Sequence, residues 1–102
     1  MRIFLDDIRL PSDNLGDDVI VVRDAETAMS LVQTGKVTWI SFDHDLGTEL
    51  SGYDVAALIE ELVFMGDIRC PEWDIHSANP VGRERIKMAM LSAEAYCSRE
   101  FS

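Results

Sequence analysis

Three short apolar runs in this chain each end in a cluster of aspartate or histidine residues. The runs with their clusters are Ile3-Phe4-Leu5 with Asp6-Asp7, Trp39-Ile40-Ser41-Phe42 with Asp43-His44-Asp45, and Trp73-Asp74-Ile75 with His76-Ser77-Ala78-Asn79. Such runs are typical of short strands, and ligands of open α/β sheets bind outside the carboxyl ends of the strands. The clusters therefore predict a fold in which these strand ends meet, forming one site from segments distant in sequence.

Apolar periodicity and end signals predict the element order β, β, α, β, α, β, α. The predicted strands are residues 2–6, 19–22, 37–43 and 72–77, and the predicted helices are residues 25–34, 53–65 and a last one from Pro80. Asp24 and Asn79 are the expected N-caps, and Gly35 and Gly66 are the expected helix ends. The uninterrupted apolar run 19–22 favours a strand covered on both faces.

This order predicts a three-layer α/β fold with a mostly parallel sheet of about four strands and right-handed crossovers. Residues 8–18 include Pro11 and Gly16, which predict a loop in place of a helix between the first two strands. No fifth strand is expected after the predicted last strand. The length of 102 residues fits a single domain spanning residues 1–102.

Charge and hydropathy exclude several classes of function. The net charge of −10 repels phosphate backbones, so we expect no extended nucleic-acid-binding surface. No stretch approaches the roughly 20 apolar residues that cross a bilayer, so we expect no membrane association and a cytoplasmic location. The two cysteines, Cys70 and Cys97, lack CxxC spacing and are expected to be reduced.

Four motifs resemble those of the cyclic-phosphate processing receiver-like domains, which are divergent relatives of response-regulator receivers. In chain order they are Leu5-Asp6-Asp7-Ile8-Arg9-Leu10-Pro11, Phe42-Asp43-His44-Asp45-Leu46-Gly47, Gly52-Tyr53-Asp54-Val55 and His76-Ser77-Ala78-Asn79-Pro80-Val81-Gly82. The resemblance covers almost the whole chain and implies a receiver- or flavodoxin-like fold. It also implies action on cyclic phosphates, such as the 2′,3′-cyclic ends of cleaved RNA.

The resemblance to ordinary receivers assigns roles to the acids but is incomplete. In receivers, two early acids and a later aspartate hold a divalent metal ion, which here implies Asp6, Asp7 and Asp43, and the later aspartate accepts a phosphoryl group. The helix after the first strand, and the fifth strand with a lysine that contacts the phosphoryl group, have no counterpart in this chain. These departures argue against a phosphorelay role.

Four carboxylates, those of Asp6, Asp7, Asp43 and Asp45, would gather at one end of the sheet. Like charges a few ångströms apart raise one another's pKa values and destabilise the fold unless a cation lies between them. Carboxylate oxygens suit Mg²⁺ or Mn²⁺, so we expect one of these ions. In the alternative interpretation, some of these acids cap helices or face solvent.

Unperturbed histidine side chains titrate near neutrality, so His44 and His76 are candidates for general acid–base catalysis. Hydrolysis of a cyclic phosphate needs a base to activate water and an acid to protonate the departing ribose oxygen. His76 is the better placed, because Ser77, Asn79 and a predicted helix N-terminus follow it. Since side chains alternate along a strand, a second interpretation places His44 in a helix layer.

The predicted helix N-terminus at Pro80 offers free N–H groups to an anion. The predicted phosphate-binding residues are Arg9, Ser77, Asn79 and Arg83. In the alternative interpretation, Arg83 is a solvated residue of the first helical turn and Asn79 only caps the helix.

The predicted function is metal-dependent hydrolysis of a cyclic phosphate or phosphate ester by Asp43, His44 and His76. The expected partner is a small phosphate-containing substrate or an RNA end. One alternative is a degenerate receiver that acts without catalysis as a signalling or protein-binding module. Another rests on the D-x-D spacing of Asp43 and Asp45, which haloacid-dehalogenase-type phosphatases use as nucleophile and acid, although their downstream lysine and acidic pair are absent.

Overall fold

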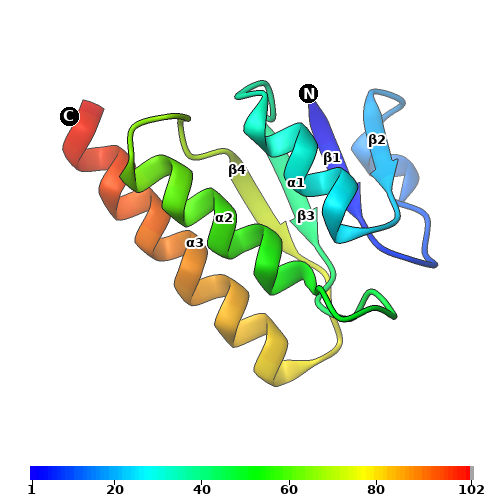
Figure 1. Cartoon of the computed structure of the whole chain (residues 1–102). Helices are drawn as coiled ribbons and strands as arrows, with labels where there is room; N and C mark the ends of the chain where they lie inside the picture. Colours follow the sequence, from blue (N-terminus) through cyan, green and yellow to red (C-terminus); the bar gives the residue numbers. More distant parts are fainter. Residues whose placement is uncertain (102) are drawn as a thin grey trace.

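A parallel sheet of four strands organises the computed structural model, which describes residues 1–101, and the side chains of residues 1–97 (Figure 1). The strands are β1 (Arg2–Leu5), β2 (Val19–Val22), β3 (Trp39–Phe42) and β4 (Glu72–Ile75), in the spatial order β2-β1-β3-β4. All three pairings are parallel, as the element order predicted. The chain order reverses between β1 and β3, which is where ligands bind in doubly wound sheets.

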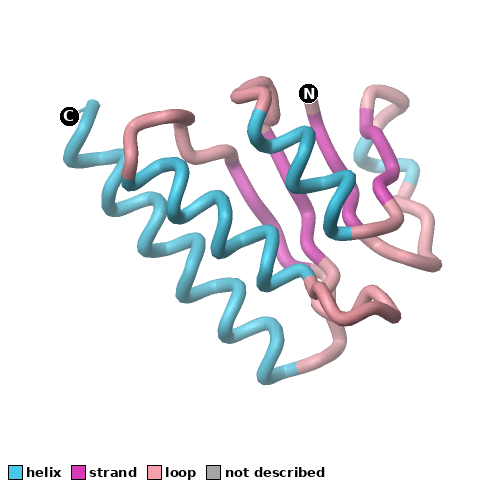
Figure 2. Tube along the Cα trace, viewed as in Figure 1, coloured by secondary structure: helices cyan, strands magenta, loops and turns pink. Residues whose placement is uncertain are grey.

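Three helices, α1 (Ala25–Gln33), α2 (Gly52–Phe64) and α3 (Pro80–Phe101), lie on one side of the sheet in the described part of the chain (Figures 1 and 2). The steps from β2 to β3 and from β3 to β4 cross the sheet in the same direction, so right-handed connections place α1 and α2 on one face. The step from β1 to β2 runs the other way, and it contains only the short 3₁₀ helix η1 (Asp13–Leu15). As expected, this connection contains a loop in place of an α-helix. The third of the three expected layers therefore consists only of this loop with its short 3₁₀ helix.

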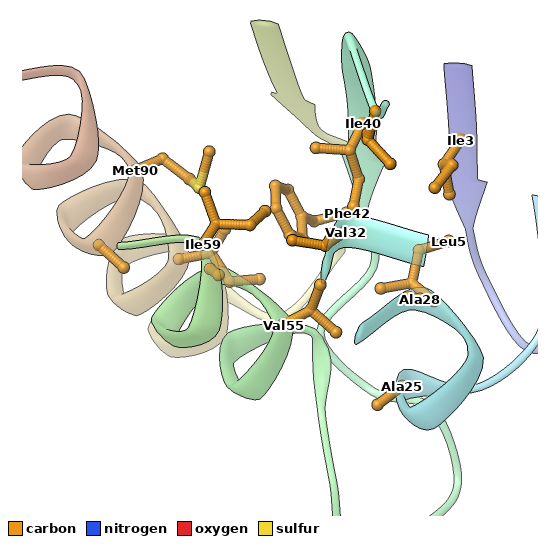
Figure 3. Packing of buried hydrophobic residues seen from close by; sticks show 14 of the residues in the cluster. Ile3, Leu5, Ala25, Ala28, Val32, Ile40, Phe42, Val55, Ile59 and Met90 are labelled. Atoms are coloured by element: carbon orange, nitrogen blue, oxygen red, sulfur yellow. The ribbon is translucent and has the colours of Figure 1, made fainter. Parts of the chain in front are cut away.

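The hydrophobic core lies between the sheet and the helices (Figure 3). Alternation along β1 and β3 directs Ile3, Leu5, Ile40 and Phe42 to the helices, and all four are fully buried. They pack against α1, α2 and α3 through Ala28, Val32, Val55, Ile59 and Met90. The intervening strand residues face the other side of the sheet, where the loop after β1 lies.

Helix ends follow the predicted local signals. The Asp24 side chain accepts a hydrogen bond from the backbone N–H of Thr27 at 2.7 Å, and the Asn79 side chain accepts one from Gly82 at 3.0 Å. Both expected N-caps are therefore confirmed. Gly35 has a φ of 74°, the left-handed conformation that glycine adopts after a helix.

The strand β2 differs from its prediction, because it forms an edge of the sheet rather than a strand covered on both faces. Ile20 is 44% exposed, and Val19 is half-buried. Four apolar residues are too short a run to distinguish an edge strand from a central one by composition. After β4 the chain enters α3, so the described residues contain no fifth strand. No helix among the described residues is long and apolar enough to span a membrane.

Candidate metal and phosphate site

Strand register brings the polar clusters together at the carboxyl edge of the sheet. The backbone N–H of Asp43 donates to the carbonyl of Leu5 at 2.9 Å, and that of His76 donates to the carbonyl of Phe42 at 2.9 Å. Leu5, Phe42 and Ile75 occupy matching positions on β1, β3 and β4. The residues that follow these strands are therefore neighbours, as the sequence predicted.

Three carboxylates form an acidic cluster at this edge, composed of Asp6, Asp7 and Asp43. One oxygen from each lies within 4.8 Å of the other two. Asp6 is 1% exposed and Asp43 is 6% exposed, whereas Asp7 is half-buried. This spacing and donor set fit a hard divalent cation, which binds carboxylate oxygens.

The pKa of Asp43 is raised above its ordinary value. Burial is the main cause, and the negative charge of Asp6 adds to it. A hydrogen bond from Ser77 and the nearby His76 and Arg9 act in the opposite direction but only in part. The ionised cluster is therefore incompletely compensated by protein groups, which is the condition that a bound cation relieves.

The pKa of Asp6 is lowered, although burial alone would raise it. The backbone N–H groups of Arg9 and Ile8 donate to Asp6 Oδ1 at 2.8 and 2.9 Å, and His76 Nε2 lies 3.0 Å from Oδ2. These contacts outweigh the burial and favour the carboxylate. Asp6 is thus held ionised and in a fixed orientation.

The ring of His76 is fixed from three sides. Its Nδ1 lies 2.7 Å from Ser41 Oγ, its Nε2 contacts Asp6, and the ring stacks on Phe4 with centroids 4.2 Å apart. Sequence reasoning missed Ser41 and Phe4 as supports of the site. The available signal was the alternation of side chains between the two faces of a strand. Phe4 precedes Asp6 by two residues and Ser41 precedes Asp43 by two, so each pair is expected on the same face of the sheet.

A pocket opens above the acidic cluster. Its lining residues are Asp6, Asp7, Ile8, Arg9, Asp43, Asp45, Gly47, Ser77 and Ala78. Gly47 has a φ of 71°, and a side chain there would meet Asp7 Oδ2 at 3.3 Å. His76 lies behind Asp6 rather than in this lining.

The ring of His44 lies apart from the acidic cluster, in the position that the second interpretation gave it. A Cβ on Gly82 would approach the His44 ring to 2.3 Å, so the ring packs directly on the first turn of α3. Its Nδ1 lies 2.9 Å from Asp45 Oδ1. Its Nε2 is buried without a hydrogen-bond partner in the described part of the molecule. Direct access of His44 to the pocket has no support in this geometry.

The carboxylate of Asp45 lines the pocket, but it lies outside the cluster of three. It is exposed and contacts His44 Nδ1 and the Asn79 side-chain amide, at 2.9 and 3.3 Å. These hydrogen bonds lower the pKa of Asp45. Of the four acids predicted as metal ligands, Asp6, Asp7 and Asp43 therefore come together in the described residues, and Asp45 does not join them.

The predicted phosphate-binding residues divide into two groups. Arg9 and Ser77 line the pocket, and Arg9 is exposed, with its guanidinium 3.7 Å from Asp6 Oδ2. Arg83 instead donates to the backbone carbonyls of Ile75 and Ser77, at 3.1 and 3.0 Å, and so links the first turn of α3 to the end of β4. Asn79 caps α3, as its alternative interpretation held.

Comparison with known proteins gives one family. The family model described as the cyclic-phosphate processing receiver domain matches residues 1–92, which include every strand, α1, α2 and the first part of α3. No curated protein and no solved structure matches the chain.

Proposed function

We propose that this chain, which belongs to the family of cyclic-phosphate processing receiver domains, hydrolyses a cyclic phosphate or phosphate ester at the acidic cluster. The observation that carries the proposal is the convergence of Asp6, Asp7 and Asp43 within 4.8 Å at the carboxyl edge of the sheet. The proposed substrate is a small nucleotide or an RNA end with a 2′,3′-cyclic phosphate. The acidic charge of the chain disfavours contacts along an extended nucleic acid.

The three carboxylates of the cluster would hold Mg²⁺ or Mn²⁺. Such an ion would neutralise charge on the phosphoryl oxygens, which two buried carboxylates would otherwise repel. Arg9 and Ser77 are the protein groups in the pocket that suit phosphate oxygens, because one brings a positive charge and the other a hydroxyl.

Hydrolysis forms one bond from a water oxygen to phosphorus and breaks one phosphorus–oxygen bond of the ring. Water loses a proton, and the departing ribose oxygen gains one. We assign proton transfer to His76, which reaches the cluster through Asp6, and not to His44, whose ring packs on Gly82. His76 lies behind Asp6 and outside the described pocket lining, so this transfer would run through the Asp6 carboxylate, whose Oδ2 lies 3.0 Å from Nε2, rather than by direct contact with the substrate.

A second candidate function is a phosphoryl-accepting signalling module. It draws support from Asp43, which is buried beside Asp6 and Asp7 in a receiver-like sheet. The two lysines, Lys36 and Lys87, are absent from the described lining of the pocket, so no lysine neutralises a phosphoryl group there. This absence favours hydrolysis over stable phosphorylation.

Two measurements on the same protein separate these functions. We expect the wild-type chain with Mn²⁺ to open adenosine 2′,3′-cyclic phosphate to a monophosphate, and Asp43→Asn to lose this turnover. We expect no phosphoryl adduct by intact-protein mass spectrometry after treatment with acetyl phosphate. An adduct that Asp43→Asn abolishes, without substrate turnover, would establish the signalling module instead.

A further inference from the structure

We propose that Ile8 selects substrates that carry a nucleobase, by packing against the flat face of the base. The inference rests on the proposed function, because it concerns the organic group attached to the phosphate at the same site. Ile8 is 79% exposed and lines the pocket together with the acidic cluster. It is the one large aliphatic side chain in the described lining of that pocket.

The backbone around Ile8 is held in place although its side chain is exposed. The N–H of Ile8 donates to Asp6 Oδ1 at 2.9 Å, as does the N–H of Arg9 at 2.8 Å. The guanidinium of Arg23 donates to the carbonyls of Asp6 and Arg9, at 3.2 and 2.9 Å. The loop therefore presents Ile8 at a fixed position relative to Asp6.

The pocket lining combines charged and uncharged residues. Asp6, Asp7 and Asp43 would bind the cation and, through it, the phosphate. The lining also includes Ile8, Ala78, which is small and exposed, and Gly47, which has no side chain. A flat group that contacts Ile8 would remove aliphatic surface from water.

Leu10 provides an internal control, because single exposed aliphatic residues are common on protein surfaces. It is 73% exposed and lies two residues from Ile8, but it is absent from the described pocket lining. A general effect of removing apolar surface from this loop would be the same at both positions. An effect through the pocket would be confined to Ile8.

The experiment compares Ile8→Ser and Leu10→Ser on two cyclic phosphates, with Mn²⁺ present. Adenosine 2′,3′-cyclic phosphate carries a base, and glycerol 1,2-cyclic phosphate has the same five-membered phosphate ring without one. We expect Ile8→Ser to lower kcat/KM about tenfold for the adenosine compound, mainly through KM, and less than twofold for the glycerol compound. Leu10→Ser should change neither value by more than twofold.

Calorimetric binding of adenosine 2′,3′-cyclic phosphate keeps this inference separate from the proposed function. If the wild type binds the nucleotide without turning it over, hydrolysis fails as a function, and a tenfold weaker Kd in Ile8→Ser still supports the role of Ile8. Equal losses on both substrates, equal effects of the two variants, an unchanged Kd in Ile8→Ser, or no binding by the wild type would each overturn it.

Discussion

Replacement of Asp43 by asparagine should stabilise the metal-free protein, although Asp43 is among its most buried polar residues. Two unit charges 4.8 Å apart repel by about 3.5 kcal/mol at an effective dielectric constant of 20. The contacts with Ser77, His76 and Arg9 offset part of this repulsion. We therefore expect Asp43→Asn to gain about 1–2 kcal/mol at pH 7 in the presence of a chelator.

The stability difference has a defined dependence on pH and on metal. The pKa of Asp43 is raised in the folded state, so Asp43 binds a proton more readily in the folded wild type than in the unfolded chain. The destabilisation caused by the ionised Asp43 carboxylate therefore fades as the pH falls through that raised pKa. Metal should reverse the order of the two proteins at pH 7. At one hundred times Kd, a cation stabilises the wild type by about 2.7 kcal/mol, and the cluster without Asp43 loses most of this gain.

Thermal unfolding followed by circular dichroism measures both effects. A change of 1 kcal/mol corresponds to about 4–8 °C for a domain of this size. Asp45→Asn is the matched control, because it removes the same charge from the same loop but from outside the cluster of three. Its response to Mn²⁺ should equal that of the wild type. An Asp43→Asn protein less stable than the wild type in chelator, or a wild-type midpoint unchanged by millimolar Mn²⁺, would refute the reasoning.

Three further substitutions test the supports of the fold and site. Gly82→Ala should cost about 1–3 kcal/mol in urea unfolding, because the added Cβ meets the His44 ring, and His44→Ala in the same chain should recover most of this loss. Ser41→Ala should cost about 1–2 kcal/mol in the same assay, since it removes the hydroxyl partner of His76 Nδ1. Asp24→Ala should cost about 1 kcal/mol at pH 7 by loss of the α1 cap. The folded-state pKa of Asp24 is lowered, so this cost should shrink as the pH falls below about 4.

Local signals were sufficient to predict most of the fold. Asp24 and Asn79 cap helices through hydrogen bonds to groups three residues away, so the sequence beside each residue contains the necessary information. The meeting of Asp6, Asp43 and His76 also followed from local patterns, because the carboxyl ends of parallel strands share one edge.

Contacts between distant segments could not be predicted in the same way. Strand alternation supported the interpretation of His44 that the structure confirms, but the sequence left a second interpretation open, and the packing of the ring on Gly82 joins two segments distant in sequence. Arg83 turns back to the carbonyls at the end of β4, which no pattern of charge along a helix predicts. The exposure of Ile20 depends on which strand lies at the edge, and that is a property of the whole sheet.

The loop in place of a helix after β1 connects the reduced fold with the geometry of the site. A sharp turn directly after Leu5 lets Asp6 Oδ1 accept the N–H groups of Ile8 and Arg9, and Arg23 from the end of β2 holds the carbonyls of the same turn. Hydrogen bonds to the charged form of Asp6 favour its ionisation, which a metal ligand needs. The same turn places the exposed Ile8 side chain in the lining of the pocket. The segment that replaces a helix after β1 therefore both fixes the Asp6 carboxylate and brings an aliphatic side chain to the same site.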